Sequence, residues 1–187
     1  MNVAPRSARR YTATAMLLHW LIAALIVWGF ALGWVMTDIP GITPTKLRYF
    51  AWHKWIGVTV LALVLVRILW RATHDAPPLP ASMPAWERAA AHAGHLALYL
   101  LMVAIPVTGY LYSSAAGIQV VYLGRWPLPV LIGPNDALKA ALRIVHVTLN
   151  YVLLASVAVH LVAVAKHQWL DRQRILARML PFGAPPD

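Results

Sequence analysis

The chain contains 187 residues, of which 60% are hydrophobic and only 12% are charged. Soluble domains carry about 25% charged residues, so this composition indicates an integral membrane protein. The chain has no Cys, which excludes disulfides, thiolate-bound zinc, thiolate-ligated haem and iron–sulfur clusters. Its net charge of +10 could suggest a nucleic-acid partner, but the basic residues flank apolar runs, as membrane topology requires. We therefore expect a lipid bilayer as the partner and no nucleic acid.

Four apolar runs are each close to the twenty or so residues that a helix needs to cross a bilayer. They cover residues 15–36, 55–70, 94–117 and 142–166, and the second extends back through His53. The first run is longer than the apolar core of a signal peptide, so we interpret it as a retained span. The sequence predicts an all-α fold, an integral membrane four-helix transmembrane bundle with antiparallel neighbours.

The bundle should form a single domain over residues 10–181, between short tails at 1–9 and 182–187. Ten Lys and Arg residues lie on the side of the two chain ends and six lie on the opposite side. The positive-inside rule then predicts that both termini are cytoplasmic. The outer side still carries an excess of cations, namely Lys46, Arg48, Lys54, Arg125, Lys139 and Arg143.

Several of the eight His residues recur near the ends of the expected spans. His53 and His146 open the second and fourth spans on the outer side, while His19 and His160 lie toward the cytoplasmic side of the first and fourth. Fourteen steps separate His146 from His160, or about 21 Å along a helix axis and about 40° around it. The two rings thus share one stripe. Two His at matching depth on different helices suit the axial positions of a haem iron, which predicts an outer and an inner pair.

Other interpretations of these residues are open at this point. A His inside a membrane can serve as an interhelical hydrogen-bond partner without any cofactor. Arg67 and Arg71 could pair with haem propionates or extend to lipid headgroups. Small residues inside the spans permit close helix packing or leave room for a porphyrin face, and these are Gly29, Gly33, Gly57 and Gly109.

The remaining His residues lie on the cytoplasmic side. His95 is the candidate for a quinone pocket, where a titratable ring exchanges protons as the quinone is reduced. His92 is interpreted as interfacial, and His74 and His167 as surface residues, although His167 could reach the same pocket. No carboxylate lies inside a span, which argues against a proton pump or a cation transporter.

Five stretches carry a further signal: "LLHWLIAALIV", "WHKWIGV", "HAGHLALYLLMVAIPVTGY", "IVHVTLNYVLLASVAVHLVAVAKHQW" and "DRQRILARMLP". Together they resemble the bacterial cytochrome b561 family over roughly residues 10 to 181. The resemblance implies a multi-pass cytochrome of the bacterial inner membrane, with two haem b groups held by bis-His ligation. It assigns His53 and His146 to the outer haem iron, and His19 and His160 to the inner one.

Some members of this family resemble superoxide oxidases, which take an electron from superoxide at the outer face and pass electrons to ubiquinone at the inner side. The excess of outer cations suits that activity because a positive surface steers an anionic substrate, although each cation could instead bind a lipid headgroup. The family is also similar to cytochrome b subunits of hydrogenases and formate dehydrogenases. We therefore expect an electron-transfer oxidoreductase of the respiratory chain that links superoxide to ubiquinone. The alternatives are an electron relay for a protein donor, such as a dehydrogenase or soluble cytochrome, and a scaffold or transporter without haem.

Overall fold

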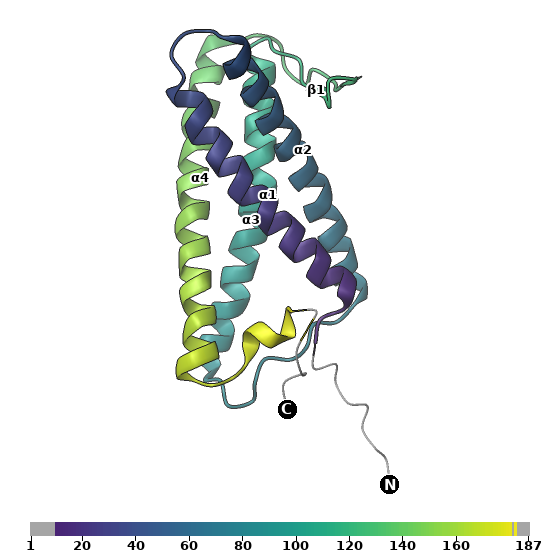
Figure 1. Cartoon of the computed structure of the whole chain (residues 1–187), viewed down its shortest axis with the longest axis vertical. Coiled ribbons are helices and arrows are strands. Elements are labelled where there is room, and N and C mark those ends of the chain that lie inside the picture. Colours follow the sequence, from purple (N-terminus) through teal and green to yellow (C-terminus); the bar gives the residue numbers. More distant parts are fainter. Residues whose placement is uncertain (1–9, 181, 183–187) are drawn as a thin grey trace.

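The computed structural model describes residues 10–180 and 182. Its four long helices are α1 (Ala13–Asp38), α2 (Pro44–Thr73), α3 (Ala85–Ala115) and α4 (Asp136–Ala165), which run the length of the molecule (Figure 1). All four are long and apolar enough to cross a membrane. The expected all-α transmembrane bundle is confirmed.

The helices α2, α3 and α4 begin several residues before the apolar runs that predicted them. At α2, Thr43 caps the helix by accepting a hydrogen bond from the Lys46 amide at 3.2 Å, and Pro44 occupies the first turn, where its missing N–H is harmless. At α4, the Asn135 side chain accepts a hydrogen bond from the Leu138 amide at 2.9 Å. These caps extend the helices into polar sequence, so hydropathy alone underestimates their lengths.

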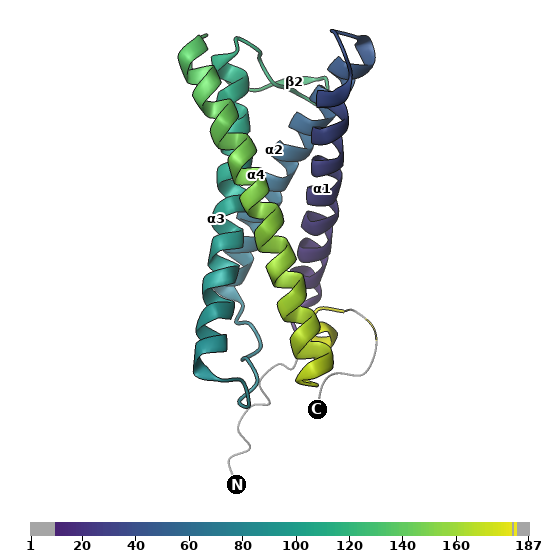
Figure 2. The same cartoon turned by 90° about the vertical axis from the view of Figure 1, so that its left-hand side faces the viewer.

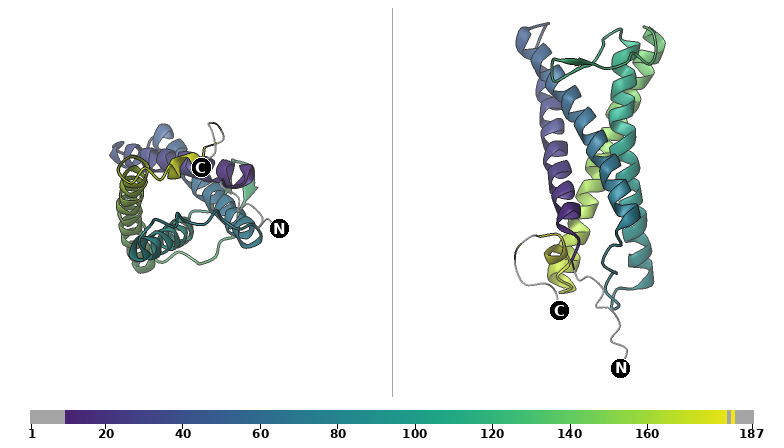
Figure 3. Two further views of the ribbon diagram at one scale, coloured as in Figure 1. Left: turned by 90° about the horizontal axis from the view of Figure 1, so that it is seen from below. Right: turned by 90° about the vertical axis from the view of Figure 1, so that its right-hand side faces the viewer.

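The helices form two closely packed pairs, α1 with α2 and α3 with α4, joined through contacts between α2 and α3. Viewed along the long axis, they surround a common centre (Figure 3). The buried core is small and lies where Ile22 of α1 meets Val60 and Val64 of α2. Many apolar side chains stay on the outside, among them Val27 at 71% and Val159 at 69% exposure. An outward apolar surface is what lipid contact requires.

One end of the bundle carries a short hairpin of β1 (Val121–Tyr122) and β2 (Trp126–Pro127), seen at the top of Figure 2. We call this the outer end, because it is the end expected outside the cytoplasm. The hairpin is attached to α2: the Trp55 indole donates to the Val121 carbonyl at 2.8 Å, and the hydroxyls of Thr59 and Tyr122 bond at 2.8 Å. The loops of the outer end are thereby fixed against the helices.

The opposite, inner end carries both the first and the last described residues (Figure 1). There α4 continues into a π-helical turn, η1 (Lys166–Leu170), and then a 3₁₀ turn, η2 (Ile175–Arg178). This segment folds back beneath α1, where the Trp20 indole donates to the Met179 carbonyl at 2.7 Å. The C-terminal segment therefore covers part of the inner end.

Candidate functional site

The outer pair of His residues comes together in the structure. His53 projects from α2 and His146 from α4, with ring centroids 6.2 Å apart and ring planes nearly perpendicular at 86°. Both side chains are partly buried. The depth matching that paired them in the sequence thus corresponds to proximity in space.

Backbone carbonyls orient both of these imidazoles. Nδ1 of His53 lies 3.0 Å from the carbonyl oxygen of Gly29 on α1, and Nδ1 of His146 lies 3.0 Å from that of Ile105 on α3. A carbonyl can only accept, so Nδ1 carries the hydrogen in each ring and Nε2 keeps its lone pair. His residues that bind metals are held in this way, with the second nitrogen fixed by an acceptor.

Gly109 supplies the space that the His146 ring occupies, and Gly33 faces the ring of His53. A Cβ at position 109 would lie 2.8 Å from His146 Cε1, and one at position 33 would lie 3.6 Å from His53 Cε1. A Cβ added at position 29 would lie 3.4 Å from Ile56, and one added at position 57 would lie 3.9 Å from Pro106. Gly29 and Gly57 therefore allow close helix packing and also line an outer cavity, whereas Gly33 and Gly109 face imidazoles.

Two neighbouring cavities meet at the outer pair. They enclose about 500 Å³ and 580 Å³ of space, part of which is open to the surroundings, and His53, Gly57, Pro106 and His146 line both. The remaining lining is mostly apolar, which is typical of cofactor sites. Two imidazoles with free Nε2 atoms in an apolar cavity fit the axial positions of a haem iron.

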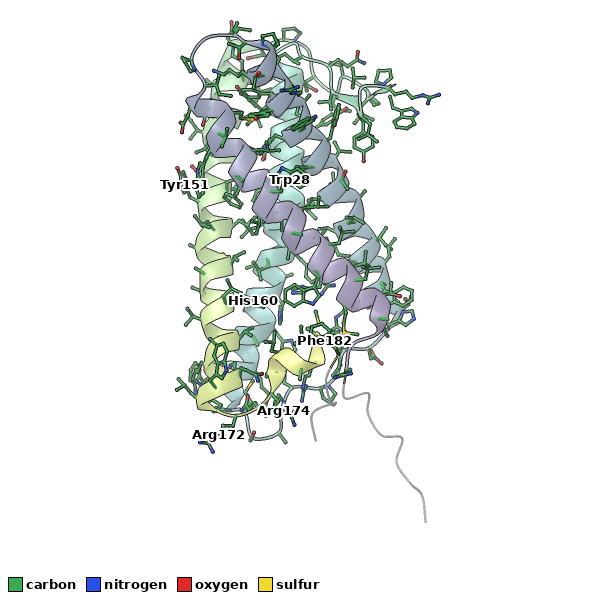
Figure 4. The ribbon with its side chains drawn as sticks, in the orientation of Figure 1. Trp28, Tyr151, His160, Arg172, Arg174 and Phe182 are labelled. Carbon is green, nitrogen blue, oxygen red and sulfur yellow. The ribbon has the colours of Figure 1, made fainter. Side chains whose placement is uncertain are left out.

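In the inner half of the bundle, the expected pair His19 and His160 is accompanied by His95, the candidate for a quinone pocket. His160 of α4 lies against His95 of α3, with ring centroids 5.6 Å apart and an interplanar angle of 64°. His19 of α1 is close enough to interact electrostatically with both, and with Arg67 of α2. Figure 4 places His160 in this inner half of the bundle. The structure thus brings His19 and His160 into one cluster and adds His95 to it.

The two candidate arginines of α2 behave differently. Arg67 Nε donates to the hydroxyl of Tyr99 at 3.0 Å, and its Nη1 donates to the Ala15 carbonyl at 2.5 Å. This arginine is therefore held by neighbouring helices and does not extend to a headgroup. Arg71 is exposed, and its Nη1 donates to the His74 carbonyl at 3.5 Å.

The six outer cations are also not equivalent. Lys54 lines one of the two cavities, whereas Lys139 forms an ion pair with Asp136 and Lys46 donates to the Ile39 carbonyl at 2.7 Å. Arg48 and Arg125 lie over the rings of Trp52 and Trp126, and Arg143 is exposed. Only Lys54 combines a positive charge with a place beside His53 and His146.

A cluster of ionisable side chains at the inner end was not predicted from the sequence. His167, expected as a surface residue, contacts Asp171 at 2.7 Å and Glu87 at 3.8 Å, and Lys166 contacts both carboxylates. Glu87 lies in the stretch before the third apolar run, which the sequence had assigned to a connection. A helix that begins at Ala85 carries this carboxylate to the end of α4.

Comparisons with known proteins agree with this architecture. The family model described as prokaryotic cytochrome b561 matches residues 10–182. The chain belongs to the prokaryotic cytochrome b561 family. It is 34% identical over 172 residues to cytochrome b561 homolog 2 of Escherichia coli strain K12, covering 91% of both chains. It is 25% identical to the probable superoxide oxidase CybB of Yersinia pestis, over 92% of this chain and 97% of that protein. It is 27% identical to a cytochrome b562 of Cereibacter sphaeroides, over 91% and 94% of the two chains.

Membership of the cytochrome b561 family fixes the general role. The protein is a multi-pass protein of the bacterial inner membrane and binds b-type haem. It acts as a membrane cytochrome b in electron transfer. The outer cavities and the orientation of His53 and His146 are suited to that cofactor.

Proposed function

We propose that the chain is a di-haem cytochrome that takes electrons from superoxide at its outer end and delivers them to ubiquinone at its inner end. The observation that carries the proposal is the placement of two His residues on α4. His146 lies beside a His of α2, and His160 lies beside a His of α3 and near a His of α1. Haem b at each site would supply reversible one-electron transfer. One helix thus contributes to both an outer and an inner site.

His53 and His146 are the proposed axial ligands of the outer haem iron. Their Nδ1 atoms are engaged by backbone carbonyls, so Nε2 of each ring is the atom that would bind iron. Two imidazoles fill both axial positions, which favours electron transfer over oxygen activation. The lining of the same region is mostly apolar.

His19 and His160 are the proposed ligands of the inner haem iron. Arg67, fixed by Tyr99, places a guanidinium within this half of the bundle, where it suits an anionic propionate. Arg71 is a second candidate for such a contact at the inner end. His95 lies against His160, which supports a quinone pocket next to the inner site.

The charge of the outer end supports superoxide as the electron donor. A positive surface raises the encounter rate of a small anion, and the effect falls with ionic strength. Lys54 is the cation nearest the proposed outer haem, since it lines the same cavity as both ligands. The similarity to a protein named probable superoxide oxidase also supports superoxide as the donor.

The haem assignment is tested by a reduced-minus-oxidised visible spectrum combined with a haem-to-protein ratio. We expect about two haems per chain with low-spin b-type spectra. His146→Ala should remove the outer haem preferentially, and His160→Ala the inner one. A ratio of one, or variants that keep both haems, would contradict the assignment.

The donor is tested by supplying superoxide to purified protein and following the reduction of a ubiquinone analogue. We expect quinone reduction with superoxide alone. Lys54→Gln should lower kcat/KM for superoxide by about three- to tenfold at low salt, whereas Lys139→Gln, which removes a charge already paired with Asp136, serves as the matched control. Reduction only in the presence of a reduced protein donor would establish the electron-relay alternative instead.

A further inference from the structure

The connection between α3 and α4 carries an exposed apolar surface that the haem sites do not use. Residues 118–134 contain a single charged side chain, Arg125. Near the tip of the hairpin, Leu123 and Trp126 are 50% and 52% exposed. The large apolar residues that are exposed in this stretch are Ile118, Val121, Leu123, Trp126, Val130 and Leu131. A continuous apolar surface of this kind marks a site of contact with a membrane or another molecule.

The turn at the tip of the hairpin holds a leucine in an uncommon backbone conformation. Leu123 has a φ of 52° and Gly124 a φ of 70°, and the Arg125 amide donates to the Tyr122 carbonyl at 3.1 Å to close the turn. A positive φ suits glycine, but in leucine it crowds Cβ against the backbone. Hairpin turns with positive φ favour Gly, Asn or Asp. The turn itself therefore gives no reason for a leucine, whereas a partner that contacts the exposed side chain does.

The attachment of the hairpin to α2 fixes its depth in the membrane. Trp55, whose indole donates to the Val121 carbonyl, lies eleven positions after the first residue of α2, or about 16 Å along the helix. Thr59, which bonds to Tyr122, lies one turn deeper. The apolar run of α2 starts at residue 55, so the hairpin is attached where this helix enters the hydrocarbon. Figure 1 shows the hairpin extending sideways from the bundle rather than along its long axis.

We propose that the hairpin lies on the outer leaflet of the bilayer, with Leu123 and Trp126 at the boundary between headgroups and acyl chains. Tryptophan concentrates at this boundary because its ring is apolar and its N–H is polar. The Arg125 guanidinium lies 5.7 Å from the centre of the Trp126 ring, which places a cation beside the apolar ring. The phosphate of a phospholipid headgroup accepts hydrogen bonds from such a guanidinium. The partner is thus the phospholipid of the outer leaflet, whatever the electron donor and acceptor are.

The same connection also forms part of the outer site. Val120, directly before β1, is 5% exposed and lines the cavity that contains both outer imidazoles. The Leu128 amide donates to the Val120 carbonyl at 2.8 Å. Tyr110 lines the same cavity, and its hydroxyl donates to the Pro129 carbonyl. Contact between the hairpin and the leaflet therefore positions one wall of the outer cavity relative to the membrane.

The depth of the hairpin is tested with single nitroxide labels, which the absence of native Cys permits. Haem-loaded protein is placed, one copy per disc, in nanodiscs of phosphatidylethanolamine and phosphatidylglycerol. Electron paramagnetic resonance then measures how accessible each label is to O₂ and to a water-soluble nickel chelate. Leu123→Cys is compared with Asp38→Cys, at the exposed outer end of α1, and with Val27→Cys, which is exposed on the apolar surface of α1.

We expect the label at position 123 to be accessible to O₂ to a degree between those of the two reference labels. A label at 123 that is as accessible to nickel as the label at 38 would overturn the proposal. Protection that appears only in discs containing two copies would also overturn it, because it would show contact between copies of the chain.

A second variant separates lipid contact from folding. Leu123→Asn removes the apolar side chain, and Asn tolerates a positive φ, so the turn itself should be less strained. Hydrogen exchange of the amides of residues 118–131 is measured in the same nanodiscs, with residues 39–43 as an internal reference. We expect exchange in the hairpin to be about fivefold faster than in the wild type, the effect of losing roughly half the burial of one leucine, and the reference to be unchanged. Unchanged or slower exchange in the hairpin would show a turn that does not depend on the leaflet, and the proposal would then be wrong.

Discussion

Replacing Gly109 with Ala tests whether the backbone of α3 sets the position of His146. The added Cβ would lie 2.8 Å from Cε1 of the imidazole and 3.1 Å from its Nδ1. Carbon atoms pack favourably from about 3.5 Å, so the ring must move by about 0.7 Å. That movement also strains the 3.0 Å hydrogen bond from Nδ1 to the Ile105 carbonyl. Metal–ligand distances tolerate only about 0.2 Å, so the variant should lose or misligate the outer haem.

The assay for Gly109→Ala is the haem-to-protein ratio together with the low-spin spectrum. We expect the ratio to fall from about two toward about one, with the inner haem retained. Gly33→Ala is the matched control because its Cβ would meet His53 at an ordinary contact distance of 3.6 Å. Gly94→Ala is a second control, since no atom lies within 4 Å of its added Cβ. A Gly109→Ala protein with two haems and an unaltered spectrum would refute the argument that this glycine positions His146.

Two further predictions concern the inner half. Tyr99→Phe removes the hydroxyl that accepts the hydrogen bond of Arg67 Nε. It should lower the free energy of unfolding by about 2 kcal/mol, measured by denaturant titration in detergent. An unchanged denaturation midpoint would show that water replaces the hydroxyl. The hydrogen bond from Lys166 and the contact with His167 hold the pKa of Asp171 below its ordinary value of 3.8. The stabilisation is therefore fully present above pH 3.8 and is lost as pH falls through the lowered value. A ¹³C titration should show a midpoint below 3.8 that rises in Lys166→Met, and a midpoint at or above 3.8 in the wild type would contradict this assignment.

The arrangement of the four ligand candidates could be predicted because it depends on helix rise alone. A span that crosses the membrane converts residue number into depth, so His53 could be matched to His146 without knowledge of packing. His19 could be matched to His160 in the same way. It could not reveal that His95 lies against His160, because contact also depends on how helices rotate about their axes.

Other parts of the site could not be predicted from the sequence for a different reason. The acceptors of His53 and His146 are the carbonyls of Gly29 and Ile105, and every residue has a carbonyl. Which one is used depends on the tertiary packing of neighbouring helices. The ion pair of Lys139 with Asp136 joins residues three positions apart, so their spacing indicates it, whereas a count of charges by membrane side gives only the net charge.

The helix α3 carries none of the four proposed ligands, yet it contacts both sites. At its outer half, the Ile105 carbonyl orients His146 and position 109 makes room for the ring. At its inner half, His95 lies against His160 and Tyr99 fixes Arg67. Positions 99 and 109 are ten residues apart, or about 15 Å along the helix. Substitutions more than about 10 Å apart that share no partner act additively. Combining Gly109→Ala with Tyr99→Phe should therefore give the sum of the two single effects on unfolding free energy. The proposed outer and inner sites can then be adjusted separately through one helix that carries none of the four proposed ligands.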